Sequence, residues 1–299
     1  MREYVGGIEA GGTKFLCVTA TGPDDICTKR RIPTTTPRET IGRVIDFFRD
    51  QGGRQSSLRA VGIASFGPID VQPASRHFGH IASTPKIGWS NIDLVGPIRE
   101  ALNLPVAFDT DVNAAALAEW YWGAAKGLDD FIYLTVGTGI GGGGMTNGEL
   151  MHGLVHPEMG HICIPHDSRI DPYAGCCPFH GDCFEGLACG PAITDRWRKP
   201  SELLPDEHPA WELEAHYLAL ALSNFLYTLS PRRIIVGGGV MQRQQLYPLI
   251  RARMLELLNR YIELVQAKDF MNEFVVAPAL GHRSGALGAI ALAQRLLNC

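Results

Sequence analysis

Val5-Gly6-Gly7-Ile8-Glu9-Ala10-Gly11-Gly12-Thr13-Lys14 is an apolar run that ends in a glycine turn. A second apolar run occupies 15–20, so this opening predicts a strand, a turn and another strand. Residues 134–144 repeat the pattern in the second half of the chain. Two copies of one unit predict two related domains that face each other.

Patterns elsewhere supply the remaining elements. Apolar periodicity predicts helices over 37–50, 94–102, 112–125, 211–229, 246–265 and 284–297, and strands over 59–65, 106–110, 131–136, 233–236 and 274–277. Thr36-Pro37 is typical of a helix start, and Gly52-Gly53 of a helix stop. We expect an N-terminal domain over 1–115 that includes the closing helix at 284–299, and a C-terminal domain over 116–283.

Composition limits the classes of function. The 299 residues suffice for two domains, and 45% hydrophobic residues against 19% charged residues are typical of a globular protein with ample core. A formal net charge of −4 provides no basic surface for nucleic acid. Neither the first residues nor the apolar run at 217–229 has the pattern of a signal peptide or a membrane span. The sequence favours a cytoplasmic protein without nucleic-acid or membrane partners.

A metal site is predicted in the stretch CCPFHGDC at 176–183. Cys177, His180 and Cys183 can turn three ligands inward on one tight loop, and a second histidine from 156–161 would complete a tetrahedral zinc site. The alternative is that these side chains fill space in a core. Five of the eight cysteines lie within 163–189, which favours reduced thiols and a metal over disulfides. Four protein ligands leave no open position for water, so the zinc would be structural.

Three glycine-rich turns indicate a nucleotide. GTGIGG at 137–142 satisfies a dinucleotide-binding pattern, but the glycines at 143–148 break any following helix, so we expect a hairpin. Glycines in such a turn let backbone N–H groups approach a phosphate, and a plain tight hairpin is the alternative. Each of the first two turns contains or precedes a threonine, Thr13 or Thr138, which favours phosphate binding over a plain hairpin. A third cluster, GGG at 237–239, follows a strand, where backbone commonly approaches a nucleotide.

Two carboxylates lie where a strand passes into a helix. Asp109 and Asp111 are each a candidate base in a cleft, and each is also a candidate cap for the helix that follows. Glu158 and Glu185 flank the predicted metal loop, where they would be held rigidly and would suit the binding of hydroxyl groups. Solvent exposure without function is the alternative for both glutamates.

Seven motifs together resemble the ROK family of sugar kinases, and within it the bacterial fructokinase branch. They are GIEAGGTK at 7–14, TPKIGW at 84–89, TDVNAA at 110–115, GTGIG at 137–141, PEMGH at 157–161, CPFHGDCFEG at 177–186 and VGGGV at 236–240. The match runs nearly from end to end of the chain. The order and spacing of the motifs make the resemblance specific.

The resemblance implies a two-lobed, actin-like (RNase H-like) α/β fold, with ATP on one side of a cleft, the sugar on the other, and a zinc-binding loop at 156–186. Asp111 would take the proton from the 6-hydroxyl of the sugar. The resemblance also implies the following residues: for the sugar, Asn113, Glu158, His161 and Glu185; for the phosphates, Gly11, Gly12, Thr13, Lys14, Thr138 and Gly139; for adenosine, Gly238 and Gly239; and for zinc, His161, Cys177, His180 and Cys183. MgATP would be the phosphate donor, and the protein would be a homodimer.

Three departures from the commoner family pattern refine these expectations. Glu9 replaces an aspartate, which changes the magnesium side of the site by one methylene. Thr110 replaces the asparagine of many glucose-using members. Pro178 and His180 replace parts of a cysteine- and glycine-rich motif, so His180 is the expected ligand, and Cys176 remains an alternative to Cys177. The last two departures favour the fructokinase branch.

The sequence therefore predicts phosphorylation of D-fructose to fructose 6-phosphate by ATP. Mannose, glucose and N-acetylmannosamine are alternative substrates. A sugar-responsive ROK regulator is a second hypothesis, but it would need a DNA-binding segment ahead of the first glycine turn. A zinc hydrolase is a third, and it would need an open coordination position.

Overall fold

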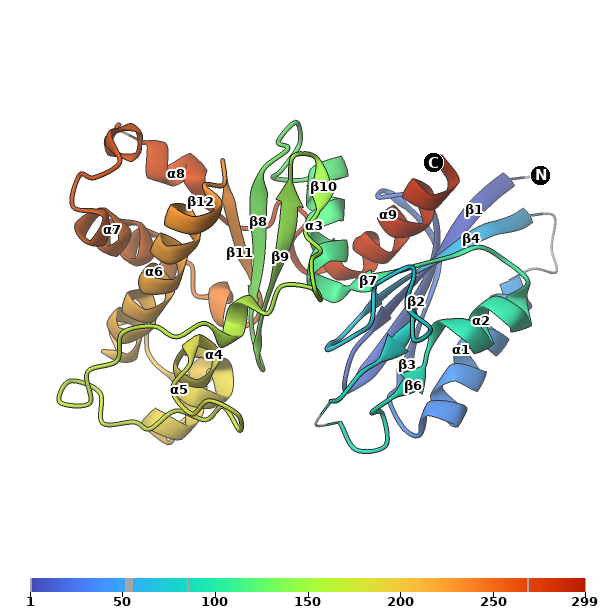
Figure 1. The fold of residues 1–299 in the computed structure, drawn as a ribbon, viewed down its shortest axis with the longest axis horizontal. Coiled ribbons are helices and arrows are strands. Elements are labelled where there is room, and N and C mark those ends of the chain that lie inside the picture. Colours follow the sequence, from blue (N-terminus) through green and yellow to red (C-terminus); the bar gives the residue numbers. More distant parts are fainter. Residues whose placement is uncertain (1, 52–55, 85, 268, 299) are drawn as a thin grey trace. The chain divides into compact units, whose positions relative to one another are not determined.

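The computed structural model describes residues 2–51, 56–84, 86–267 and 269–298, and the chain forms two compact units (Figure 1). The first unit contains the residues up to Lys126, the segment Leu150–Pro157 and the residues from His282 onward. The second unit contains Gly127–Glu149 and Glu158–Gly281. The residues predicted to stop the first helix, Gly52 and Gly53, lie outside the described residues, as does Pro85.

A five-stranded mixed sheet forms the centre of the first unit. Its strand order is β3-β2-β1-β4-β7. These strands are β1 (Arg2–Ala10), β2 (Lys14–Gly22), β3 (Asp25–Pro33), β4 (Ser56–Ser65) and β7 (Val106–Thr110), with the short pair β5 (His80–Ile81) and β6 (Ile92–Asp93) beside the sheet. Neighbours β1, β2 and β3 are antiparallel, whereas β1, β4 and β7 are parallel. The parallel edge places the end of β7 next to the end of β4.

Helices cover both faces of this sheet. Helices α1 (Pro37–Gln51) and α2 (Val95–Leu102) bury apolar side chains on one face, where Phe47 and Phe48 join a core with Ile8 of β1. Helices α3 (Asp111–Trp122) and α9 (Ser284–Asn298) cover the other face. A Cβ atom at Gly288 would lie only 2.3 Å from the backbone of Ala114, so the glycine permits close packing of α9 on α3.

The second unit has a sheet of the same plan. Its strand order is β10-β9-β8-β11-β12, with β8 and β9 antiparallel and with β8, β11 and β12 parallel. These strands are β8 (Phe131–Val136), β9 (Ile140–Thr146), β10 (Glu149–Leu150), β11 (Ile234–Gly237) and β12 (Val275–Val276). Because β1–β2 and β8–β9 hold equivalent places in the two sheets, the repeat predicted from the sequence is confirmed.

The described part of the second unit contains five α-helices. They are α4 (Phe184–Ala188), α5 (Gly190–Trp197), α6 (Ala210–Leu229), α7 (Leu246–Leu258) and α8 (Phe270–Phe274). Helices α6 and α7 pack on each other, and the long apolar face of α6 is buried. Between Met151 and Cys183 the only helical element described is the single 3₁₀ turn Met159–His161. The loop predicted around the metal site is therefore present.

The structure differs from the sequence-based expectations at several boundaries. The predicted domain boundary at residue 115 falls inside α3, and the whole helix belongs to the first unit because it packs on α9. The helix predicted over 246–265 ends at Leu258, since Asn259 adopts a left-handed conformation with φ 43°. Strand β3 was not predicted. No helix among the described residues is both long and apolar enough to cross a membrane.

Candidate active site

Asp111 is the first residue of α3, directly after strand β7. The cap of the helix is Thr110, whose Oγ1 accepts a hydrogen bond from the backbone N–H of Asn113 at 3.1 Å. The Asp111 side chain is half-buried, and its Oδ1 accepts from the backbone N–H of Val112 at 2.9 Å. Since Thr110 fills the capping position, Asp111 is not required there.

Asp109 is buried in a polar cluster that the sequence did not predict. Its Oδ1 accepts from the backbone of Thr110 and from Nδ2 of Asn113, at 2.8 and 3.0 Å. Its Oδ2 lies 2.8 Å from Nε2 of His152. Asn113 is fully buried, and its Nδ2 also donates to the backbone carbonyl of Met151. His152 comes from a distant segment and carries no recognisable motif, so only the tertiary structure reveals it.

The first glycine turn, at 11–14, connects β1 and β2. The backbone N–H of Gly11 donates to the carbonyl of Lys14 at 3.0 Å, and Oγ1 of Thr34 donates to the carbonyl of Gly11 at 2.7 Å. Burial raises the pKa of the neighbouring Glu9, and the positive charges of Lys14 and Arg31 oppose that shift. Thr13 and Lys14 are exposed, so the turn presents a hydroxyl and a cation at the surface.

The second glycine turn, at 137–140, is the predicted hairpin. The backbone N–H of Gly137 donates to the carbonyl of Gly139 at 2.9 Å. Oε2 of Glu185 accepts from the backbone N–H of Ile140 at 2.7 Å. A Cβ atom at Gly139 would lie 2.6 Å from that carboxylate oxygen. The absence of a side chain therefore lets Glu185, on α4, approach the turn directly.

The third glycine cluster follows β11. Gly238 has φ +99°, and a Cβ atom there would lie 2.3 Å from the carbonyl oxygen of Val136. Only glycine fits both this backbone conformation and this close approach. Gly239 is exposed, and a Cβ atom there would meet no atom within 4 Å.

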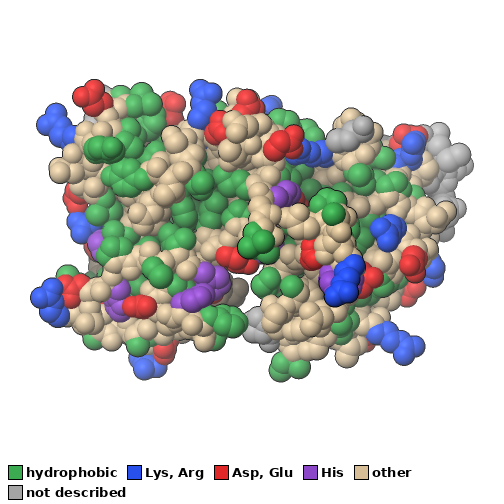
Figure 2. Space-filling view, in the orientation of Figure 1, with side chains coloured by type: hydrophobic (Ala, Val, Ile, Leu, Met, Phe, Trp, Pro, Cys, Tyr) green, Lys and Arg blue, Asp and Glu red, His purple; other side chains and the backbone are tan. Residues whose placement is uncertain are grey.

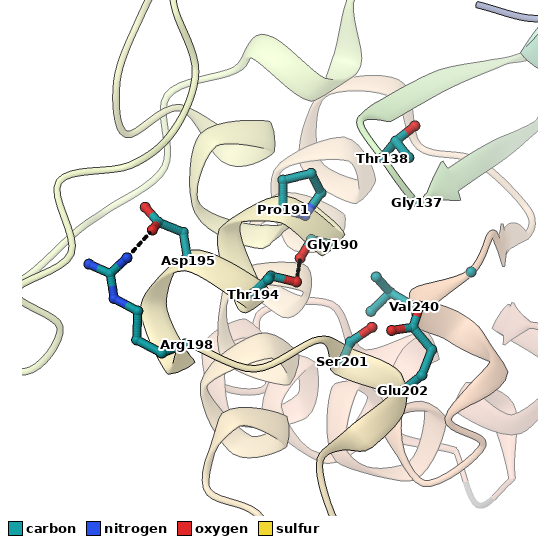
Figure 3. Close-up of a pocket in the computed structure, with 11 residues that line it drawn as sticks. Gly137, Thr138, Gly190, Pro191, Thr194, Asp195, Arg198, Ser201, Glu202 and Val240 are labelled. Atoms are coloured by element: carbon teal, nitrogen blue, oxygen red, sulfur yellow. Dashed lines mark hydrogen bonds and ion pairs between the residues drawn. The ribbon is translucent and has the colours of Figure 1, made fainter. Parts of the chain in front are cut away.

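A pocket of about 740 Å³ lies between these two turns of the second unit, and its size suits a nucleotide-sized ligand (Figure 3). Figure 3 shows Thr138 and Val240 on one side and the residues of α5 on the other. The lining residues are Gly137, Thr138, Gly190, Pro191, Thr194, Asp195, Arg198, Ser201, Glu202, Gly239 and Val240. The contribution of α5 and of residues 198–202 was not predicted, because no recognised nucleotide-binding motif marks them.

Four predicted metal ligands lie together in the second unit. One donor atom each of His161, Cys177, His180 and Cys183 lies within 4.8 Å of all the others. Sγ of Cys177 is 3.7 Å from Nδ1 of His161 and 3.6 Å from Nδ1 of His180, and Sγ of Cys183 is 3.6 Å from Nδ1 of His161. Tetrahedral zinc with bonds of about 2.0–2.3 Å places neighbouring ligand atoms roughly 3.3–3.8 Å apart, so the donor set fits zinc.

Cys176 does not join this donor set. Its Sγ lies 3.6 Å from Sγ of Cys189 instead. The adjacent backbone explains the separation, since Cys176 N–H donates to the carbonyl of Gly186 and Cys177 N–H donates to that of Gly181. The cluster of possible metal ligands therefore contains Cys177, and the choice of Cys177 over Cys176 as a zinc ligand stays a prediction.

A buried ion pair fixes the loop that carries the donor set. Oδ2 of Asp171 lies 3.0 Å from Nη2 of Arg196 on α5 and accepts from the Tyr217 hydroxyl of α6 at 2.6 Å. The guanidinium of Arg196 also stacks over the Tyr173 ring at 4.6 Å. These contacts join the loop to α5 and α6 without regular secondary structure.

Glu158 precedes, and His161 ends, the 3₁₀ turn Met159–His161, which packs on β9. A Cβ atom at Gly160 would lie 2.0 Å from the carbonyl oxygen of Ile140, and Met159 packs where Gly142 leaves space. Glu158 is exposed. The small residues thus fix the position of both predicted sugar ligands on the second sheet.

The predicted site residues divide between the two units. The first unit holds Gly11, Gly12, Thr13, Lys14, Asp111 and Asn113, and the second holds Thr138, Gly139, Glu158, His161, Cys177, His180, Cys183, Glu185, Gly238 and Gly239. On the face in Figure 2, Lys and Arg side chains are dispersed among Asp and Glu. That distribution gives no support to a nucleic-acid interface on this face.

Comparisons with known proteins agree on one family. The sequence model of the ROK family matches residues 5–296. A fructokinase from Zymomonas mobilis is 45% identical over 99% of this chain and 98% of its own length, and one from Lactococcus lactis is 44% identical over 88% of both chains. The crystal structure of a ROK hexokinase from Thermus thermophilus matches with a TM-score of 0.77 and 26% identity, over 99% of both chains.

Proposed function

Because the chain belongs to the ROK family, we propose that it is a hexose kinase that transfers the γ-phosphoryl group of ATP to D-fructose and forms fructose 6-phosphate. The observation that carries the proposal is the pocket of about 740 Å³ bounded by two glycine turns. The near full-length similarity to two fructokinases supports fructose as the sugar. Mannose, glucose and N-acetylmannosamine remain the competing substrates.

The nucleotide is assigned to the pocket beside α5. Gly238 and Gly239 would accept the adenosine, because glycine leaves the backbone open to a flat ring at the end of β11. Thr138 and Gly139 would contact the phosphates through a hydroxyl and a backbone N–H. The turn at Gly11, Gly12, Thr13 and Lys14, whose last two residues are exposed, would supply a hydroxyl, a cation and backbone N–H groups other than that of Gly11 for the same chemistry.

Asp111 is assigned as the general base. Phosphoryl transfer has a loose transition state, so catalysis depends on positioning and on charge stabilisation. Asp111 would orient the 6-hydroxyl of the sugar and take its proton as the new P–O bond forms. Its place at the start of α3 holds the carboxylate on a rigid element, and its bond to the backbone of Val112 limits its rotation.

The sugar is assigned to the carboxylates and the histidine of the second unit, together with the α3 terminus. Glu158, His161 and Glu185 would hydrogen-bond ring hydroxyls. Asn113 is fully buried, so we assign it a positioning part through Asp109. Glu185 also touches the phosphate turn, which would couple sugar binding to the position of Ile140.

Two metals belong to the proposal. Magnesium enters with ATP, and Glu9, whose pKa is raised by burial, lies beside the first turn. Zinc would be held by His161, Cys177, His180 and Cys183. When bound, it would cross-link the loop and supply no open coordination position. His161, with one ring nitrogen in the donor set, would be fixed in orientation for its proposed sugar contact.

The test is a set of initial rates with fructose, mannose, glucose and N-acetylmannosamine under saturating MgATP. We expect the highest kcat/KM with fructose. Phosphate release without a sugar, or no turnover with any hexose, would contradict the proposal.

The described cysteines are free thiols, which suits a reducing compartment, and we propose a cytoplasmic homodimer on the family resemblance. Light scattering after size-exclusion chromatography measures the assembly.

A further inference from the structure

The strongest unexplained feature is a buried carboxylate that holds an exposed histidine. The Asp109 side chain is 4% exposed and the His152 side chain is 37% exposed, with Oδ2 and Nε2 2.8 Å apart. The other oxygen of Asp109 accepts from Thr110 and Asn113. Asp109, Thr110, Asn113 and His152 all belong to the first unit.

The pairing orients the imidazole. A buried carboxylate is costly unless it is hydrogen-bonded, and three donors satisfy Asp109 here. Donation from Nε2 fixes the tautomer and the plane of the His152 ring, as carboxylate partners do for functional histidines. The Nδ1 edge of the ring is thereby set in one direction.

A purely structural role, the attachment of the segment around His152 to the first unit, does not account for the Asp109–His152 contact. The segment that carries His152 is already attached to the first unit at three other points. Asn113 donates to the carbonyl of Met151, Gln72 donates to the carbonyl of Gly153, and Nε2 of His156 accepts from the backbone N–H of Ile69. An exposed histidine is not needed as a fourth attachment.

The position of His152 relates it to the proposed base. Asp109 and Asp111 are separated by one residue at the β7–α3 junction, and Asn113 lies one helical turn beyond Asp109. We propose that His152, oriented by Asp109, is a sugar-binding residue that hydrogen-bonds a ring hydroxyl of the hexose and contributes to the choice of hexose. This inference rests on the proposed function, because it takes the acceptor to be a sugar.

His152→Gln is the decisive variant. The glutamine amide can occupy the place of Nε2 and keep the bond to Asp109, but it lacks the Nδ1 edge. We expect the Kd for fructose, measured by calorimetry, and the KM for fructose to rise about tenfold, the value of one hydrogen bond. The KM for MgATP and the melting temperature should remain near those of the wild type.

Gln72→Ala is the matched control, since it removes another attachment of the same segment without a proposed sugar contact. His152→Gln with wild-type affinity for fructose overturns the inference, as does an equal loss in Gln72→Ala or an equal rise in the KM for MgATP. If the wild type binds fructose without phosphorylating it, the proposed kinase activity fails while the Kd values still test His152. If it binds no hexose, both fail.

Discussion

Asp111 carries the chemistry in the proposed mechanism but little of the fold. Asp111→Asn keeps an oxygen for the backbone N–H of Val112 and leaves the Thr110 cap intact, so folding should be unchanged. Loss of a general base typically costs about 10²–10⁴-fold, and we expect a fall of that size in kcat. Steady-state rates and a melting curve measure the two effects.

Glu100→Gln provides the control for charge, because Glu100 is an exposed carboxylate on α2. It should behave like the wild type in both measurements. Near-normal turnover of Asp111→Asn would mean that another group takes the proton of the sugar hydroxyl.

Glu214 is a buried carboxyl on α6 whose two oxygens have no hydrogen-bond partner among the described residues. Burial raises its pKa well above 4.5, opposed by the charge of Arg196. The folded state therefore binds the proton more tightly than the unfolded state does. Stability is greatest below the unfolded pKa and falls as the pH rises toward the folded pKa.

Glu214→Gln removes this ionisation while it preserves the shape of the side chain. We expect the free energy of unfolding of the variant, relative to that of the wild type, to increase as the pH rises above about 4.5. The difference should grow by about 1.4 kcal/mol per pH unit until the folded pKa of Glu214 is reached. Urea unfolding between acid and neutral pH measures it. Glu212→Gln, at an exposed position of the same helix, should show no such trend. Parallel curves for wild type and Glu214→Gln would show that Glu214 does not titrate in this way.

The loop between the 3₁₀ turn and α4 has almost no regular structure, so its order depends on side chains. Its donor set includes Cys177, whereas the adjacent Cys176 pairs with Cys189. We expect Cys177→Ser to lower the zinc content from about one ion per chain to a small fraction, because zinc binding and loop folding are coupled. Its melting temperature and its affinity for the sugar should fall together.

Cys176→Ser is the neighbouring control and should retain zinc. Elemental analysis by plasma mass spectrometry and a thermal melt separate the two variants. Loss of zinc from Cys176→Ser alone would mean that Cys176, and not Cys177, is the ligand. Loss of zinc from both variants would also contradict the assignment of Cys177 as the ligand in place of Cys176.

The chain as a whole should respond to the nucleotide by becoming more stable. A ligand that binds only the folded state at 100 times its Kd adds about 2.7 kcal/mol, which for a chain of 299 residues corresponds to a rise in Tm of roughly 4 °C. We expect this rise with MgADP alone, because every residue that lines the pocket beside α5 belongs to the second unit. Differential scanning calorimetry measures it, with inorganic phosphate as the control. An unchanged Tm at saturating MgADP would remove the nucleotide from that pocket.

Local sequence determined much of the fold and the chemistry of the candidate site. Alternating apolar runs around glycine turns specify β1–β2 and β8–β9, because strand periodicity and turn glycines act over a few residues. The spacing of Cys177, His180 and Cys183 specifies three donors on one loop for the same reason. Strand β3 was not predicted, because most of its residues are exposed and its sequence lacks the alternation of apolar and polar residues.

Tertiary structure alone decided which distant groups meet. The sequence left Cys176 as an alternative to Cys177, and the backbone bonds to Gly186 and Gly181 separate their sulfur atoms. His152 reaches Asp109 from more than forty positions away, and α5 forms one wall of the nucleotide-sized pocket without any motif. Such contacts depend on how whole elements pack, and packing sums many weak interactions that no short stretch of sequence encodes.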